Sequence, residues 1–144
     1  MGARYSVPRV AVAANTAADT LTITAPAGRS LKIWAIRMGN TSTAAAACEI
    51  GVYRSTAGTT PVAITPTPVN ADSAAATFTA ASTWTTTPTL GVQIARFNMT
   101  AVGAIDNRPF PPGAEIDVPG GGQVSFRAIS GTNLVGFEVL VEQV

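Results

Sequence analysis

Short runs of alternating apolar and polar residues dominate this sequence. The clearest run is Thr20–Ala25 (TLTITA), in which Leu21 and Ile23 alternate with threonines. A period of two residues places successive side chains on opposite faces of a β-strand. No window shows the sustained 3.6-residue period that is typical of an amphipathic helix. The pattern therefore predicts an all-β chain.

Further strands are predicted wherever similar runs lie between clusters of Gly, Pro, Asn and Thr. The predicted strands span residues 5–13, 20–25, 30–38, 48–54, 90–99, 114–118, 123–129 and 134–144. Ser30–Met38 is apolar on both faces, which predicts that one face meets the core and the other a neighbouring element or subunit. Pro8 has no N–H group for a sheet ladder, so the first run is interpreted as an edge strand or an arm.

Two segments interrupt this alternation. Residues 55–89 are rich in Thr, Ala and Pro, and Asp72 is their one charged residue. A structureless loop of that length is unusual in a compact domain, so a short strand or helical turn is expected near residues 75–84, with Trp84 as an anchor. Residues 106–113 (DNRPFPPG) predict a turn with an exposed apolar knuckle at Phe110.

The length and the turn spacing together predict the fold. A chain of 144 residues is expected to form one domain. Eight or nine short strands predict an antiparallel β-sandwich, and the favoured version is a jelly roll of about eight strands with an extended N-terminal arm. The arm, or edge strand, covers residues 1–14, and the jelly-roll domain covers 15–144 with the excursion at 55–89. Periodicity alone leaves an immunoglobulin-like sandwich open, although Cys48 is the single cysteine and no Cys–Trp–Cys pattern exists.

The low charge content changes the functional interpretation. Charged residues make up 12% of the chain, against about 25% in an average soluble domain. Such a surface is better suited to being covered by other protein. The net charge of +1 predicts no strong field for nucleic acid or lipid, so neither nucleic acid nor a membrane is expected as a partner.

Few residues could support catalysis. The chain has no histidine, so neither a Ser–His–Asp triad nor a Cys–His pair can form. Glu115 and Asp117 share a face of one short strand and are interpreted as solvated acids; with Asp106 they could offer oxygens to calcium, but no calcium-loop spacing accompanies them. Cys48 is interpreted as a buried, inert thiol. We therefore expect no enzyme, no cofactor and no metal site.

Interface residues are predicted where apolar or arginine side chains occur in segments that are not expected to be core. They lie in the arm, in the knuckle and in the excursion, and are Arg4, Tyr5, Arg9, Trp84 and Phe110. A carbohydrate site is the alternative, since jelly rolls often carry lectin sites. Its candidate aromatic planes are Trp34, Tyr53 and Trp84.

Several short motifs, in order, resemble a known family. They are Arg4–Val7, Val10–Ala13, Ala18–Leu21, Ser30–Ile36, Thr67–Asn70, Phe97–Met99, Arg108–Phe110 and Gly136–Val139. This order is similar to the small jelly-roll decoration (cement) proteins that coat the capsids of tailed bacteriophages. The resemblance implies a non-enzymatic virion structural protein that stabilises the phage head by bridging major capsid subunits.

The resemblance also implies a place and a set of partners. The protein would be made in the bacterial host cytoplasm and would end on the outer capsid surface of the virion. Its partners would be the major capsid protein and copies of itself, as a homotrimer in preference to a dimer. A carbohydrate-binding module, or a fibre or tail structural module of a phage, remains the alternative function.

Overall fold

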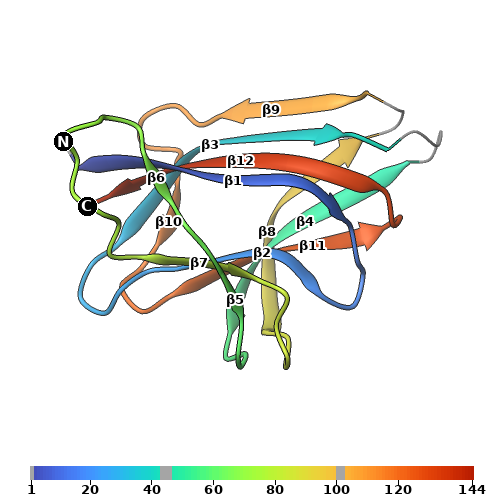
Figure 1. Ribbon diagram of the computed structural model, residues 1–144, viewed down its shortest axis with the longest axis horizontal. Coiled ribbons are helices and arrows are strands. Elements are labelled where there is room, and N and C mark those ends of the chain that lie inside the picture. Colours follow the sequence, from blue (N-terminus) through green and yellow to red (C-terminus); the bar gives the residue numbers. More distant parts are fainter. Residues whose placement is uncertain (1, 43–46, 100–102) are drawn as a thin grey trace.

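Two antiparallel sheets packed face to face form the whole of the described structure (Figure 1). The computed structural model describes residues 2–42, 47–99 and 103–144. Sheet A contains β1 (Ala3–Ala13), β3 (Leu31–Asn40), β6 (Thr67–Pro68), β9 (Ile105–Pro109), β10 (Ile116–Val118) and β12 (Leu134–Gln143). Sheet B contains β2 (Asp19–Thr24), β4 (Cys48–Thr56), β5 (Val62–Ile64), β7 (Thr79–Ser82), β8 (Thr89–Met99) and β11 (Gln123–Ser130).

The strand order is that of a jelly roll. In sheet A, β12 lies between β3 and β1, and both β9 and β10 pair with the far side of β3. In sheet B the central order is β2-β11-β4-β8. The chain alternates between the sheets from β1 to β4, and again from β8 through β9 and β11 to β12, which is the connectivity of an eight-stranded jelly roll. The predicted fold class is therefore confirmed.

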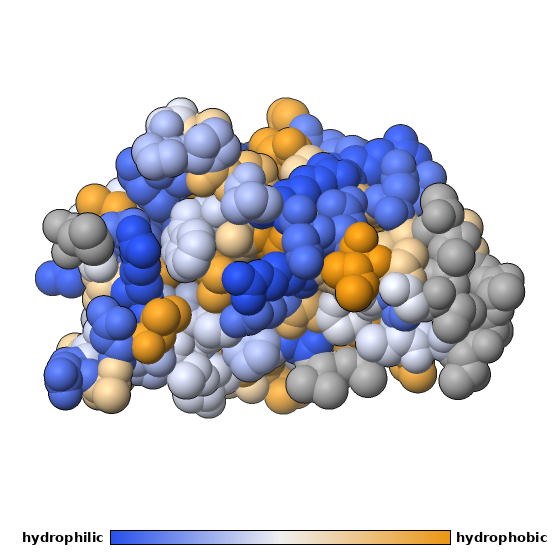
Figure 2. Space-filling model, turned by 90° about the horizontal axis from the view of Figure 1, so that it is seen from above, coloured by the Kyte–Doolittle hydropathy of each residue, from blue (hydrophilic) through white to orange (hydrophobic). Residues whose placement is uncertain are grey.

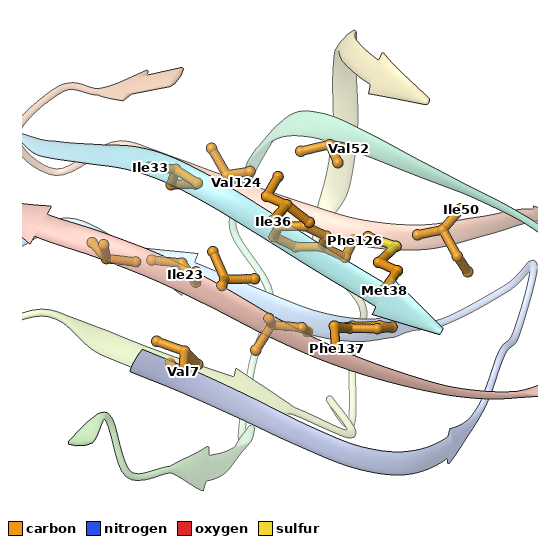
Figure 3. Close-up of a cluster of buried hydrophobic side chains, with 14 of the residues drawn as sticks. Val7, Ile23, Ile33, Ile36, Met38, Ile50, Val52, Val124, Phe126 and Phe137 are labelled. Atoms are coloured by element: carbon orange, nitrogen blue, oxygen red, sulfur yellow. The ribbon is translucent and has the colours of Figure 1, made fainter. Parts of the chain in front are cut away.

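The core is the layer of side chains between the two sheets (Figure 3). Alternation along each strand selects these side chains: in β12, Val135, Phe137 and Val139 are buried, whereas Leu134 and Glu138 on the opposite face are not. Phe126 of sheet B stacks on Phe137 of sheet A with ring centroids 5.9 Å apart. Aliphatic residues fill the remaining space, so the low aromatic content still gives a continuous core.

Of the two predicted alternatives for residues 1–14, the structure shows the edge strand rather than an extended arm. β1 pairs with β12 from Ala3↔Gln143 to Ala13↔Leu134, with an irregularity between Arg9 and Val12. Val7 is fully buried in the core. The segment is held by burial because Tyr5 and Val7 face the core, so it is part of the domain.

The excursion at 55–89 extends both sheets. β7 pairs with β2, and β5 pairs with β7 at the edge of sheet B. β6 crosses to the other layer and pairs with Tyr5 and Ser6 of β1. The short strand expected near residues 75–84 is confirmed as β7, while β5 and β6 are strands that the sequence pattern did not predict.

The predicted turn at residues 106–113 is wrong in its first half. β9 runs from Ile105 to Pro109 along β3, and Phe110 N–H then donates to the Trp34 carbonyl at 2.8 Å. Phe110 is half-buried against the core, so it is not an exposed knuckle. The polar sequence of β9 is possible because β9 is an edge strand, where only one side is paired and proline is tolerated.

Candidate contact surface

Part of the outer face of sheet B is covered by the chain itself. Three polar side chains on this face, Thr22, Ser55 and Ser125, are 1%, 6% and 0% exposed. Trp84, which follows β7, donates its indole N–H to Thr22 Oγ1 at 3.1 Å, and the two serine hydroxyls bond each other at 2.7 Å. The predicted role of Trp84 as an anchor is therefore confirmed.

A buried ion pair fixes this cover to the sheet. Arg127 Nε donates to Asp19 Oδ1 at 2.7 Å, and Thr22 Oγ1 donates to Asp19 Oδ2 at 2.8 Å. Arg127 Nη2 also donates to the Pro88 carbonyl at 3.0 Å. The two ionised side chains are 13% and 0% exposed. Because both bonds of Arg127 reach segments far apart in sequence, the cluster joins β2, β11 and the segment that leads into β8.

Farther along the same face, Tyr53 fills the space above a glycine. A Cβ atom added to Gly51 would lie 2.4 Å from Cε2 of the Tyr53 ring and 2.7 Å from its hydroxyl oxygen. The ring therefore lies directly over the Gly51 backbone. Gly51 itself is buried, although it belongs to the outer face.

On the outer face of sheet A, the described residues leave the region around Gly39 and Gly136 uncovered, and charged side chains near it pair with one another. Arg37 and Glu138 form an ion pair of 3.2 Å across β3 and β12, and Ser6 Oγ donates to Glu138 Oε1 at 2.9 Å. Nearby, the Arg4 guanidinium carbon lies 5.2 Å from the centroid of the Trp34 ring. Seen from above the upper layer of Figure 1, hydrophobic residues are scattered among hydrophilic ones (Figure 2).

A shallow hollow of about 490 Å³ lies on this face. Gly39 of β3 and Gly136 of β12 are paired directly across the sheet and form part of its lining. Ile105 pairs with Gly39 from the other side, also lines the hollow, and is 72% exposed. The ion pair of Arg37 and Glu138 borders the same hollow.

The structure does not bring the five predicted interface residues together on one surface. Tyr5 is only 2% exposed, its hydroxyl donates to the Ala74 carbonyl at 2.9 Å, and its ring meets Phe78 edge-on at 5.4 Å. Tyr5 is thus a core residue, and its predicted contact role is withdrawn. Phe110 is half-buried beside the core, as described above.

The remaining predicted residues lie on different parts of the molecule. Arg4 is on the outer face of sheet A, whereas Trp84 covers sheet B. Arg9 Nε donates to the Thr20 carbonyl at 3.1 Å, which links β1 to sheet B, and burial lowers the pKa of its guanidinium. The hollow around Gly39 was missed because a glycine was interpreted as the end of the strand, whereas β3 continues to Asn40.

The other candidate chemistry is accounted for by local contacts. Cys48 is fully buried, as predicted, and burial raises the pKa of its thiol. Hydrogen bonds from the backbone N–H groups of Glu115 and Gly113 lower the pKa of the Glu115 carboxyl. Asp106 pairs with Arg108 at 2.9 Å. Within the ranges that the structure describes, no three Cys, Asp or Glu residues are grouped so that they could hold a metal ion.

The same described ranges contain no helix with the length and hydropathy of a membrane span. No protein-family model matches the chain, and no curated protein and no solved structure matches it either.

Proposed function

We propose that this chain is a capsid decoration protein of a tailed bacteriophage. It lies on the outer surface of the head, where it bridges major capsid subunits and contacts copies of itself. It performs no catalysis in this role, and it is made in the cytoplasm of the bacterial host. The jelly-roll fold and the motif order described above are consistent with this proposal.

The observation that carries the proposal is the way in which the chain uses its few charges. Five ion pairs engage five of the nine basic and five of the eight acidic residues. These pairs are Arg4–Glu142, Arg37–Glu138, Arg96–Glu49, Arg108–Asp106 and Arg127–Asp19. A surface whose charges are paired loses less solvation when it is covered by a neutral protein surface than a surface with the same number of isolated charges.

Exposed apolar side chains supply the second part of the argument. Large apolar residues between 42% and 72% exposed occur on both layers: Val62, Val69, Val92, Ile105, Leu134 and Val144. Each can contribute roughly 25 cal/mol per Å² of apolar area when it is covered. A capsid presents the same surface many times, so modest contacts add through avidity. This is the physical basis on which a small, weakly charged domain can stabilise a large shell.

The test is a binding experiment with phage heads that lack this protein. We expect saturable binding, measured by co-sedimentation and by cryo-electron microscopy, and heads that survive heating better once they are covered. Deletion of the first twelve residues would be a poor probe, because it removes Tyr5 and Val7 from the core. Substitution of single exposed residues (Val62→Ser, Val92→Ser, Leu134→Ser) leaves the fold intact and identifies the face that is bound. Heads that take up no protein at any concentration would refute the proposal.

A carbohydrate-binding module is the second candidate, and the position of Tyr53 favours it. The Tyr53 ring covers Gly51 and is half-exposed on the outer face of sheet B, where a sugar could stack on it. Trp84 is not equivalent, because it is engaged with Thr22. The test is a glycan array with the wild type and with Tyr53→Ala. Glycan binding that is lost in this variant would favour the module over the decoration protein.

A further inference from the structure

Gly39 is a glycine that the described part of the domain does not require. Its φ lies outside the left-handed region, and no described atom would lie closer to an added Cβ atom than the Ala104 carbonyl oxygen, at 4.0 Å. Glycine in the interior of a strand weakens the sheet, and it often marks a place where another chain approaches closely. Gly39 lies in β3, between β12 and β9, and its partner across β12 is a second glycine, Gly136. Neither the local backbone nor the packing of the described residues accounts for the missing side chain at Gly39.

The hollow that these glycines leave lies next to a projecting side chain. Ile105 is the most exposed large hydrophobic residue of the described chain, at 72%, and it stands beside Gly39 on the same face of sheet A. The hollow of about 490 Å³ is large enough to receive an isoleucine side chain. A projection and a complementary recess therefore occur side by side on one surface.

We propose that a second copy of this chain docks on the hollow, so that Ile105 of each copy enters the hollow of the other. Because the projection and the recess open in the same direction, two copies can satisfy both only by meeting face to face. Face-to-face contact of identical patches is the geometry of a two-fold dimer. The biological purpose of this contact rests on the proposed function, in which the chain contacts copies of itself. The contact makes a dimer the unit that assembles on the capsid.

Charge complementarity supports the same occupant. The ion pair of Arg37 and Glu138 borders the hollow, and its side chains are 55% and 36% exposed. A two-fold axis beside the hollow brings the pair of one copy against the pair of the other in the reverse direction. Arg37 then faces the partner's Glu138, and the partner's Arg37 faces Glu138. The third charged residue of the lining is Arg9, whose Nε donates to the Thr20 carbonyl of its own chain, so the exposed pair of Arg37 and Glu138 is the part of the patch that is complementary to itself.

The first measurement is the solution mass of the protein across a wide range of concentration, by sedimentation equilibrium. We expect a reversible dimer with twice the chain mass of 14.6 kDa. Ile105→Ser removes two buried side chains per dimer and should weaken dimerisation roughly 100-fold. Gly39→Leu fills the recess from within and should weaken dimerisation to a similar degree, while the monomer keeps its fold by circular dichroism.

Val92→Ser is the matched control. Val92 is 71% exposed, almost the same as Ile105, but it lies on β8 of the other sheet. We expect this variant to dimerise as the wild type does. A monomeric wild type, a trimer, or a dimer that is unaffected by Ile105→Ser and Gly39→Leu would overturn the inference. Equal weakening by Val92→Ser would overturn it as well.

The outcome is separable from that of the proposed function, because the mass is measured without phage heads. If the protein is a monomer that binds heads, the dimer inference is wrong and the decoration proposal stands. If it is a dimer that does not bind heads, the decoration proposal is wrong and the dimer inference stands. Both results are obtained with the full-length chain.

Discussion

Gly51 and Gly39 lie at comparable places in the two sheets, and the chain treats them in opposite ways. Both are on interior strands and both face outward, Gly51 from β4 of sheet B and Gly39 from β3 of sheet A. Tyr53 of the same strand fills the space above Gly51, while no described residue fills the space above Gly39. The space above Gly51 is thus completed within one molecule, and the space above Gly39 is the one that the proposed partner would occupy.

The ion pairs of the two faces differ in the same way. On sheet B, Asp19 and Arg127 are buried beneath the segment that contains Trp84 and Pro88. On sheet A, Arg37 and Glu138 remain in solvent. If this contrast is correct, substitutions on sheet B will reduce the stability of the monomer, and equivalent substitutions on sheet A will leave it nearly unchanged.

The largest effect is expected from Asp19→Ala. The Arg127 side chain is only 13% exposed, and this substitution removes the carboxylate that pairs with its guanidinium. It also removes the acceptor of the Thr22 hydroxyl. Removing one partner of a buried ion pair costs about 3–5 kcal/mol of the free energy of unfolding. Urea denaturation followed by tryptophan fluorescence measures this loss.

The control for Asp19→Ala is Arg37→Ala on the other face. An exposed pair contributes at most about 1 kcal/mol, so the loss of Arg37 should be several times smaller. Equal losses for the two variants would show that the two faces do not differ as described.

A smaller effect is expected from Trp84→Ala. The substitution removes a half-buried ring and the bond that it donates to the buried Thr22 side chain. We expect a loss of about 2 kcal/mol, roughly half of that for a fully buried tryptophan. Trp84→Phe keeps an aromatic ring but loses part of the indole together with its bond to Thr22, so it should cost about 1 kcal/mol. Thermal unfolding of the two variants shows how much of the loss comes from removing the aromatic cover, and identical losses would contradict the role of the ring as a cover.

Tyr5→Phe tests the correction that moved Tyr5 into the core. The substitution removes the buried hydroxyl that donates to the Ala74 carbonyl and so deletes one hydrogen bond between β1 and the excursion. The expected loss is about 1 kcal/mol. Tyr53→Phe, on the exposed side of sheet B, should stay within roughly 0.5 kcal/mol of the wild type. The measurement is the free energy of unfolding of both variants by chemical denaturation. If neither variant loses stability, the assignment of Tyr5 to the core is wrong.

Alternation in the sequence was sufficient to predict most of this fold, because burial of one face of each strand is its direct cause. It predicted the strands that became β2, β4, β8, β11 and β12 nearly to their ends. It failed at β9, where Asp106 and Arg108 pair with each other and the Arg108 guanidinium carbon stands 4.1 Å from the centroid of the Phe97 ring at the open edge of the sandwich. A polar run at a sheet edge is held by tertiary contacts, which a local pattern does not contain.

The surface was harder to predict than the fold. Tyr5 and Val7 share a face of β1, so the two-residue period could have placed Tyr5 in the core; the neighbouring arginines suggested an interface instead. The hollow depends on Gly39 and Gly136, which are 97 residues apart in sequence and meet only through the register of β3 and β12. Which glycine ends a strand and which one opens a recess is decided by that register.

The same substitution at the two glycines gives the smallest effect and the sharpest comparison. Gly39→Ala adds a methyl group in open space and removes the conformational cost of glycine, so the monomer should gain about 0.5–1 kcal/mol. In Gly51→Ala the added methyl group displaces the Tyr53 ring, so the free energy of unfolding should fall by roughly 1 kcal/mol or more. The measurement is chemical denaturation at a concentration low enough to keep the protein monomeric, because a methyl group in the hollow also hinders the proposed dimer. Opposite signs mean that the chain keeps Gly39 at the expense of its own stability, and a protein does so where another molecule needs the space. If both variants are less stable than the wild type, the monomer itself requires a glycine at position 39.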